Sequence, residues 1–523
     1  LSVGETPVSG LPSSVSRPWS HLSVGETPVS GLPSSVMTHP PFVIRSRHVV
    51  ILGTLAAAAV LAWRPRAEYA LIVPALLAAA LVWRWPALGP VGLLVVALVT
   101  PFALGTGTQT ALPLAFLLVP ALAGLWLAKG VLRRGVRLPA TPATLPLVGL
   151  IVVVSLAWLA GYLPWNPFAQ LAPLRAQAGE WGVFVFSALA FWLAAASLRE
   201  VRWLKTLTYL FLALGAVYLL GRAAQPYWPP AAKVVGLFPV GATGSLLWTW
   251  LAALAAGLAV FDHDLRPALR AALFGLIALL FAVAWGQGRG WASGWLPPLA
   301  AVLVILFLRS PRFGLFWGTL LVVGFILNLS RLKGVVLVEN QLYSWDTRLA
   351  AWEILLNIAR ASPVIGLGPA NYYFYTPLYP ILGYYVNFNS HNNYMDLLLQ
   401  TGALGLGLFL WFAAAVGREA WAARANFKLQ TSNFKFQISK NQHPAVNSQQ
   451  PAASSQRQIG MGFECGYAHG ALAGLVGTLA AGMLGDWFLP FVYNVGIAGF
   501  RASLLAWLFL GGLVALRSCD SRS

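Results

Sequence analysis

Long apolar runs separated by short polar breaks extend from Arg45 almost to the last residue of the chain. Most runs approach the length of roughly 20 residues that a helix needs to cross the hydrocarbon of a bilayer. Backbone groups in lipid must be satisfied within their own segment, so the runs predict helices. We expect about twelve to fourteen spans, because the first two runs are short and the pair around Gly288 could be re-entrant. The predicted spans cover residues 48–63, 68–83, 87–104, 111–128, 144–163, 181–197, 205–221, 241–261, 271–287, 291–308, 313–329, 392–416, 467–485 and 495–516. The pattern therefore predicts an all-α fold, a polytopic transmembrane helical bundle.

One long polar and aromatic interval, residues 330–391, interrupts this pattern between two late spans. Within it, residues 346–360 have helical spacing, with Leu349, Trp352 and Leu356 on one side. The segment is too short and polar to span, so we expect a helix at the membrane interface with its tryptophan facing lipid or the bundle. A membrane protein with so much polar sequence in one loop is expected to do its chemistry there.

Composition agrees with a membrane protein, since 58% of the residues are hydrophobic and only 9% are charged. The net charge of +19 could indicate nucleic acid, but the lysines and arginines occur in small groups without a nucleic-acid motif, so we expect no nucleic-acid partner. The groups fall in alternate breaks, which the positive-inside rule assigns to the cytoplasm. Both termini are then cytoplasmic, although Arg64 and Arg66 depart from the rule. The outward breaks carry Arg175, Arg222, Arg289 and the interval 330–391.

The remaining organisation follows from repeats and polarity. Residues 1–15 recur without change at 22–36, directly before Met37. We interpret residues 1–36 as a low-complexity leader outside the fold, with translation starting at Met37. Residues 37–279 form the N-terminal spans, 280–416 a central region, and 467–523 the C-terminal spans. Residues 417–466 are expected to be a flexible cytoplasmic insertion or, less simply, a partner-binding segment.

Two cysteines, Cys465 and Cys519, fit neither a disulfide framework nor a metal-binding spacing. We assign them no role and expect no metal site and no cofactor.

His391 is the strongest candidate for a catalytic residue. Ser390 or Asn389 could act as N-cap, which would place the imidazole in the first turn of a membrane helix. The positive end of the helix dipole disfavours protonation there, and a neutral histidine is a competent general base. The alternative is a hydrogen-bonded histidine at the membrane interface without a catalytic role.

Tyr372, Tyr373 and Tyr375 belong to an unusually aromatic part of the same interval. Tyrosines at a membrane surface usually form an interfacial belt. They could also form a platform for sugar rings, since an aromatic face packs against sugar C–H groups. Together with Asn392, they are our candidate residues for binding a glycan acceptor.

Several short motifs of this region occur in a fixed order. They are Gly288-Arg289-Gly290, then Arg348 and Trp352, the run from Ser362-Pro363 to Gly366-Leu367-Gly368, and His391-Asn392 followed by Gly402-Ala403-Leu404-Gly405. In this order they resemble the signature of the O-antigen ligase and polymerase superfamily. Gly288 stands where the family usually has serine, which leaves the arginine match intact. The resemblance covers roughly residues 280–415.

The resemblance implies a metal-independent, inverting glycosyltransferase of the GT-C type at the outer side of the cytoplasmic membrane. Its donor would be a glycan on undecaprenyl pyrophosphate, and its acceptor a hydroxyl of a glycolipid or another glycan. His391 would be the base. A pyrophosphate leaving group needs fixed positive charge, which arginine supplies. Arg289 is the first candidate, followed by Arg222 and Arg175, and Arg348 either holds the loop or binds phosphate. For each of these arginines the alternative is a snorkelling side chain at the interface.

Other functions remain open from the sequence. A polymerase that joins two lipid-linked glycans needs the same residue types as a ligase, and so does transfer of a glycan to a protein. A transporter or flippase usually carries ionisable groups at mid-membrane, whereas the acidic residues of this chain lie mostly in loops or at span ends. Asp486 and Arg501 flank the last outward turn and could form an ion pair or contact substrate.

Overall fold

The computed structural model describes residues 72–105, 111–133, 135, 138–288, 291–327, 345–440 and 461–520. The leader 1–36, the predicted span 48–63, Arg289 and the first part of the interval 330–391 lie outside the described residues. One compact unit comprises residues 67–523, and the description below concerns that unit alone.

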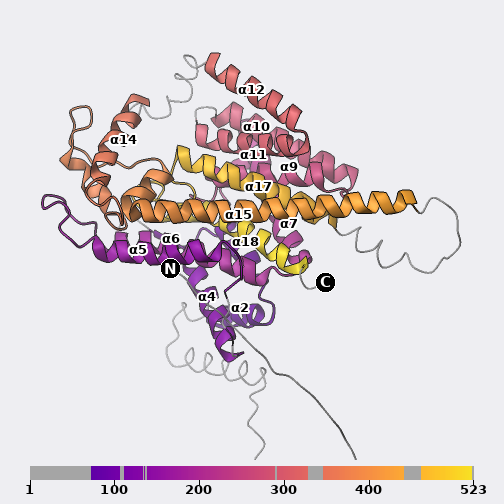
Figure 1. The fold of residues 1–523 in the computed structure, drawn as a ribbon, viewed down its shortest axis with the longest axis horizontal. Coiled ribbons are helices and arrows are strands. Elements are labelled where there is room, and N and C mark those ends of the chain that lie inside the picture. Colours follow the sequence, from indigo (N-terminus) through magenta and orange to yellow (C-terminus); the bar gives the residue numbers. More distant parts are fainter. Residues whose placement is uncertain are drawn as a thin grey trace, which may run out of the picture. The chain divides into compact units, whose positions relative to one another are not determined.

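Helices account for nearly all of the described elements (Figure 1). Eight are long and apolar enough to cross a membrane, and four further apolar helices are shorter, which confirms the all-α polytopic bundle. Every predicted span from 68–83 onward overlaps a helix. The pair around Gly288, α10 and α11, is long enough to cross rather than re-enter.

The helices are α2 (Ile72–Arg84), α3 (Leu88–Val99), α4 (Leu114–Leu132), α5 (Thr144–Ala160), α6 (Leu174–Ser197), α7 (Val201–Ala224), α8 (Ala231–Val235), α9 (Ser245–Phe261), α10 (Pro267–Gly288), α11 (Ala292–Arg309), α12 (Pro311–Leu327), α14 (Trp345–Ala359), α15 (Asn393–Lys440), α17 (Met461–Leu484) and α18 (Phe500–Asp520). Short 3-10 turns are η2 (Asn371–Phe374), η3 (Thr376–Leu378) and η4 (Ile497–Gly499). Strands β1 (Ala103–Gly105) and β2 (Ala111–Pro113) pair antiparallel between α3 and α4.

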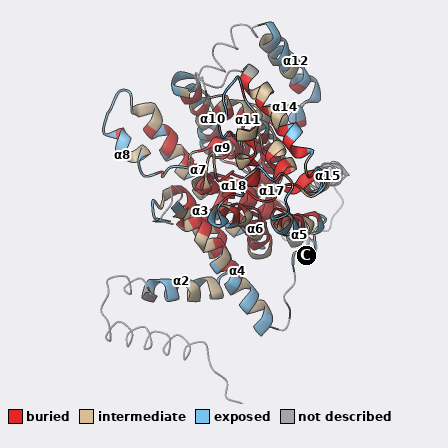
Figure 2. Cartoon of the chain, turned by 90° about the vertical axis from the view of Figure 1, so that its left-hand side faces the viewer, coloured by how far each residue is buried: buried red, intermediate tan, exposed pale blue. Residues whose placement is uncertain are grey.

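The centre of the bundle is made by α6, α9, α17 and α18 (Figure 2). The stretch of α18 that is apolar enough to cross a membrane is 94% buried inside the protein. The corresponding stretch of α10 is only 22% buried, so α10 turns most of its surface away from the bundle. Helices α9 and α17 approach closely, because Gly257 lies against the backbone of Gly466 and Gly470. Small residues at a crossing let membrane helices gain van der Waals contact over their backbones.

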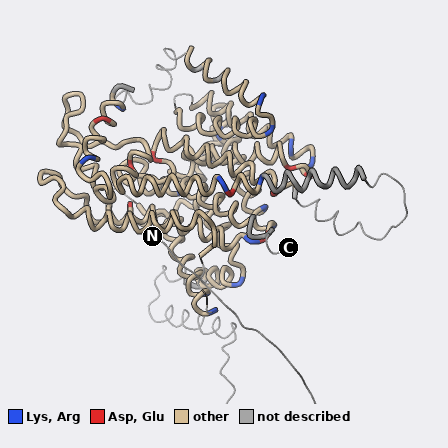
Figure 3. Tube along the Cα trace, in the orientation of Figure 1, with Lys and Arg blue, Asp and Glu red and all other residues tan. Residues whose placement is uncertain are grey.

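Most of the Lys and Arg residues that Figure 3 colours lie towards one end of the bundle, hereafter the basic end. There Lys205 of α7 lies over the ring of Phe463 at the start of α17, and the N–H of Gly462 donates to Asp264. The opposite end, hereafter the loop end, contains the segments 161–173, 360–392 and 485–499. The grouping is what the positive-inside prediction requires, and the assignment of the basic end to the cytoplasm stays a prediction.

Helix α15 is broken near its start by Gly402, whose φ of 65° and ψ of −171° are not helical. The segment after α14 docks into this break. The N–H groups of Ala403 and Leu404 donate to the carbonyls of Pro363 and Val364, at 2.9 and 3.2 Å. In return, the N–H groups of Leu367 and Gly368 donate to the carbonyls of Leu399 and Gln400. The two glycine motifs found in the sequence are therefore the two halves of one backbone joint.

Helix α14 covers the segment 346–360, for which a helix at the membrane interface was expected. Leu349 and Leu356 of the predicted apolar face are exposed, as a side that faces lipid would be, whereas Leu355 and Ile358 are buried. One expectation about α15 needs correction. Residues 417–440, expected to belong to a flexible insertion, continue α15 as helix, and residues 441–460 lie outside the described part of the chain.

Arg501 bonds backbone carbonyls and not its predicted partner Asp486, and its contact with substrate stays a prediction. Its guanidinium donates to the carbonyls of Val96, Thr100 and Phe102 and so fixes the end of α3 to the start of α18. Buried carbonyls that have left a helix need donors, and an arginine can supply several of them.

Candidate active site around His391

His391 lies at the loop end, directly before α15, and not in its first turn as predicted. The N-cap is Asn392, whose Oδ1 accepts the N–H groups of Tyr394 and Met395 at 2.9 and 3.3 Å. His391 itself has a φ of 47°, a left-handed conformation that is rare for a side-chain-bearing residue. Such conformations persist where the surroundings fix them, and they concentrate at functional sites. The sequence placed the cap two to three residues too early.

A buried polar cluster holds the loop that carries His391. The carboxylate Oδ1 of Asp396 accepts the hydroxyl of Tyr372 at 2.5 Å and that of Ser390 at 2.6 Å. Ser390 Oγ also accepts the N–H of Asn392 at 2.9 Å. These bonds connect the start of α15 to η2 and leave the chain little freedom on either side of the histidine.

Arg348 and Trp352 of α14 approach the same loop. The indole N–H of Trp352 donates to the carbonyl of Ser390 at 3.0 Å, so the tryptophan faces the protein. Burial, together with the nearby positive charge of Arg348, lowers the pKa of His391 to about 4. The imidazole is therefore neutral at physiological pH, for a reason other than the helix dipole expected from the sequence. Among the described residues, no acceptor bonds the buried Nε of Arg348.

Asn494 and Asp486, which lie between α17 and α18, are the partners of His391 that sequence reasoning missed. Nδ2 of Asn494 lies 3.1 Å from Nδ1 of His391, and it also donates to Oδ1 of Asp486. Oδ2 of Asp486 accepts the N–H of Phe491 at 2.7 Å. Burial raises the pKa of Asp486 above the usual range of an aspartate. Nothing in the residue order connects position 494 with position 391, so no sequence signal identified the pair.

The predicted tyrosine platform is not formed by the residues chosen for it. Tyr372 and Tyr375 are 0% and 3% exposed, so neither ring presents a face to a sugar. Tyr373 is partly buried and stacks on Tyr493 with ring centroids 4.5 Å apart. Exposed tyrosines are found instead at a tight hairpin, where Tyr384 and Tyr385 are 71% and 69% exposed.

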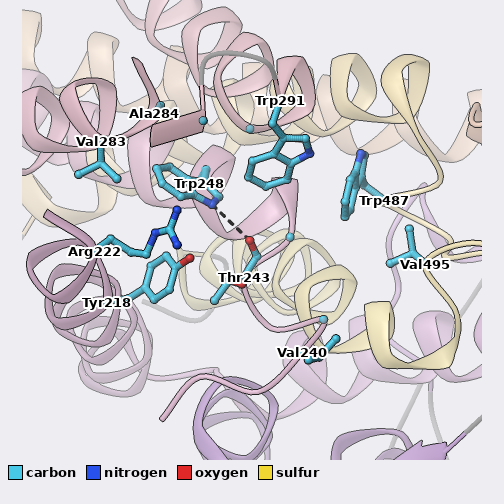
Figure 4. Close-up of a pocket in the computed structure, with 14 residues that line it drawn as sticks. Tyr218, Arg222, Val240, Thr243, Trp248, Val283, Ala284, Trp291, Trp487 and Val495 are labelled. Carbon is cyan, nitrogen blue, oxygen red and sulfur yellow. Dashed lines mark hydrogen bonds between the residues drawn. The ribbon is translucent and has the colours of Figure 1, made fainter. Parts of the chain in front are cut away.

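A cavity of about 340 Å³ opens near the ends of α7 and α10 (Figure 4). Arg222 of α7 extends into it between Tyr218 and Trp248, and Gly288 of α10 forms part of its wall. Arg289 is the next residue along the chain, outside the described part. Two apolar helices, α9 and α11, begin at this cavity, since Gly244 and Trp291 are their N-terminal flanking residues and both line it. Helix N-termini and an arginine together favour an anion.

The loop 486–495 both lines the cavity and bonds His391. Trp487 and Val495 line the cavity, while their chain neighbours Asp486 and Asn494 form the hydrogen-bonded chain to His391. The structure thus connects Arg222 and Gly288 with His391 and Arg348 through residues 486–495. Arg175 is different, because it is exposed at the start of α6 and does not line this cavity.

Metal ligands do not cluster in the described residues, where no group of three or more His, Cys, Asp or Glu side chains could hold an ion. The arrangement can supply a neutral imidazole, a half-buried guanidinium near it, and a second guanidinium in a cavity lined by aromatic rings.

Comparison with known proteins gives one family. A family model described as O-Antigen ligase matches residues 274–410. A comparison with curated proteins found no match. The matched part contains both halves of the glycine joint as well as Arg348 and His391. The resemblance to the O-antigen ligase superfamily is therefore confirmed for residues 274–410 of this multi-helix membrane protein.

Proposed function

We propose that the protein is a glycosyltransferase that moves a glycan from undecaprenyl pyrophosphate to an acceptor hydroxyl on the outer side of the cytoplasmic membrane. The observation that carries the proposal is that the loop 486–495 bonds His391 through Asn494 and also lines the cavity that holds Arg222. The family match supports a ligase or polymerase type of reaction. The bilayer is then the working environment, with both termini in the cytoplasm.

His391 would accept the proton of the acceptor hydroxyl. A base must be unprotonated to act, and burial beside Arg348 keeps the imidazole neutral. Its fixed position on a loop held by Asp396 and Ser390 limits the orientations that the ring can take. Orientation of this kind is one of the larger contributions that a protein makes to a transfer reaction.

Arg222 would stabilise the pyrophosphate as it leaves, and Arg289, which follows the cavity residue Gly288 in the sequence, is the second candidate for this role. The buried Nε of Arg222 bonds no acceptor among the described residues, so an anion oxygen could fill this position. The aromatic walls, which include Trp248, Trp291 and Trp487, suit the apolar part of a lipid-linked donor. Arg348, which approaches His391, is the candidate for the phosphate nearest the reacting carbon.

The acceptor oxygen attacks the anomeric carbon and forms a new glycosidic bond, while the bond from that carbon to the pyrophosphate oxygen breaks. The leaving group keeps the bonding electrons as undecaprenyl pyrophosphate, and the acceptor proton passes to His391. Direct attack from the opposite face inverts the anomeric centre, and no step calls for a metal or a cofactor.

Joining of two lipid-linked repeat units is the alternative proposal, and it differs only in the acceptor. Donor transfer to a glycolipid core in purified protein, without transfer to a second lipid-linked glycan, identifies a ligase. The reverse preference identifies a polymerase.

The central test uses purified protein in liposomes with a lipid-linked glycan donor. His391→Ala should lower the rate of transfer by about a hundredfold to ten-thousandfold, the usual contribution of a positioned base. His263→Ala, at the basic end, is the matched control and should retain the wild-type rate. Wild-type activity in His391→Ala would remove the proposed mechanism.

The leaving-group assignment has its own test in the same assay. Arg222→Ala should lower kcat/KM for the donor, because negative charge on the leaving oxygen grows in the transition state. Arg360→Ala, at an exposed arginine that follows α14, is its control. EDTA should leave the wild-type rate unchanged, and a strict requirement for a divalent ion would contradict the proposal.

A further inference from the structure

The segment between α7 and α9, residues 225–240, leaves several large apolar side chains uncovered. Tyr227 and Trp228 are 90% and 58% exposed, and Leu237 and Val240 are 54% and 86% exposed. The segment follows the loop end of α7, and Figure 2 shows its short helix α8 beyond the edge of the bundle. A membrane protein meets lipid at this edge, so these side chains have a partner other than water within reach.

Helix α7 holds the segment in place. A Cβ added to Gly221 of α7 would lie 3.2 Å from Cγ2 of Val235 in α8, so the two helices touch. Phe238 is buried, and its ring packs edge-on against Tyr218 with centroids 5.2 Å apart. The position of the exposed side chains is therefore fixed relative to the loop end of a membrane-spanning helix.

The backbone of the segment bonds within itself. Its four prolines have no N–H group, and local turns pair most of the others with carbonyls three or four residues earlier, at 2.8–3.2 Å. The N–H groups paired in this way belong to Tyr227, Trp228, Ala231, Ala232, Lys233, Gly236, Leu237 and Phe238. An unpaired peptide group is costly to move from water towards lipid, so a non-spanning segment enters the membrane surface readily only when its backbone is paired. A loop that faces water has no such requirement.

The side chains have the chemistry of the headgroup layer. Tryptophan and tyrosine concentrate there because each combines an apolar ring with one polar group. Lys233 is exposed on α8, and its ammonium can reach lipid phosphate while its stem lies along apolar surface. We propose that residues 225–240 are a membrane-surface anchor, which lies among the lipid headgroups at the loop end with the bilayer itself as its partner.

The anchor adjoins the cavity described above. Val240 lines the cavity, and Arg222, in the last turn of α7, extends into it. Contact of the anchor with the headgroups places the mouth of the cavity at the depth where a lipid-linked pyrophosphate lies. This consequence rests on the proposed function, whereas the anchor itself does not.

The first measurement needs no activity. Trp228→Cys, in protein with Cys465→Ser and Cys519→Ser, is labelled with the fluorophore NBD and placed in nanodiscs of phosphatidylcholine and phosphatidylglycerol. Lipids with a doxyl group near the headgroup should quench the label, and aqueous iodide should quench it several times less than a label at His263→Cys, an exposed position at the basic end. Equal iodide quenching at the two positions, without quenching by the doxyl lipid, would overturn the anchor.

The second measurement separates the bilayer from a glycan as the partner. Tyr227→Ser/Trp228→Ser should lower kcat/KM for a donor with a full polyprenyl chain in liposomes by about tenfold, which corresponds to about 1.4 kcal/mol. With a short-chain donor that is soluble in water, the same variant should keep the wild-type kcat/KM. Exchange of the two rings in Tyr227→Trp/Trp228→Tyr keeps an aromatic pair at the interface and should retain the wild-type values with both donors.

The outcomes distinguish the anchor from the proposed function. An equal fall of kcat/KM for both donors would mean that Tyr227 and Trp228 contact the glycan, and would overturn the anchor. Wild-type values with both donors would overturn its link to the cavity. Wild-type transfer in His391→Ala would contradict the proposed function, while quenching of the label at Trp228→Cys would still decide the anchor.

Discussion

Docking of the segment 362–368 against α15 depends on the backbone conformation of Gly402. Its φ of 65° and ψ of −171° belong to a region that only glycine occupies readily. A Cβ built on Gly402 would lie 2.2 Å from the carbonyl carbon and oxygen of Val364. Gly402→Ala must therefore strain the backbone and also push the docked segment 362–368 out of the break in α15.

The expected cost can be worked from these two effects. A side-chain-bearing residue in such a region costs about 1–3 kcal/mol. Displacement of the docked segment also loses the bonds from Ala403 and Leu404 to the carbonyls of Pro363 and Val364, each worth about 0.5–1.5 kcal/mol. Gly402→Ala should thus lower stability by about 2–6 kcal/mol and reduce transfer activity, because the segment before the break follows directly on His391.

Thermal unfolding of detergent-solubilised protein, followed by gel filtration of the remaining folded fraction, measures the effect. Gly407→Ala is the matched control: it lies five residues further along α15, and an added Cβ meets nothing within 4 Å. This control should melt at or slightly above the wild-type temperature, because alanine favours a helix over glycine by about 1 kcal/mol. Equal melting of Gly402→Ala and Gly407→Ala would refute the reasoning.

Three further predictions concern the site. Transfer activity should be level around neutral pH and fall as the pH drops towards about 4, where His391 takes up a proton and stops acting as a base. Arg348→Gln removes a positive charge that disfavours the imidazolium, so the fall of kcat on the acidic side should move to higher pH. If it does not move, Arg348 has no influence on the pKa of His391. Tyr372→Phe removes the hydroxyl that donates to Asp396 and should lower stability by about 1–3 kcal/mol. Its KM for the glycan acceptor should stay at the wild-type value in the liposome assay, and a raised KM would return Tyr372 to the acceptor site.

The spans were predictable because hydrophobicity alone decides which segments lie in lipid. The first residue of α6 is an example of what hydrophobicity does not predict. The predicted run began at residue 181, whereas the helix begins at Leu174 and includes Gln177 and Glu180 in its first turns. Both polar side chains are buried, and Glu180 accepts bonds from Gln400 and from the N–H of Val492. Partners more than 200 positions away compensate this polarity, so a hydropathy pattern cannot reveal it.

The same limit applies to the candidate site. The family motifs identified His391 and Arg348, and the structure brings the two together. The choice of Tyr372 and Tyr375 for sugar binding was wrong in this structure because aromatic composition does not show which rings the loop buries. Asn494 was missed because its relation to His391 exists only after α17 and α15 pack side by side.

The break at Gly402 also separates two mechanical environments. Residues 393–401 are held by the loops at 362–371 and 486–492, whereas the remainder of α15 runs through the bundle as one long helix (Figure 1). Membrane helices tilt when the thickness of the bilayer changes. A helix without a break would pass such a tilt to its first residue and to the histidine before it. We expect the break to reduce the tilt that reaches His391, because the loops at 362–371 and 486–492 bond residues 393–401 directly.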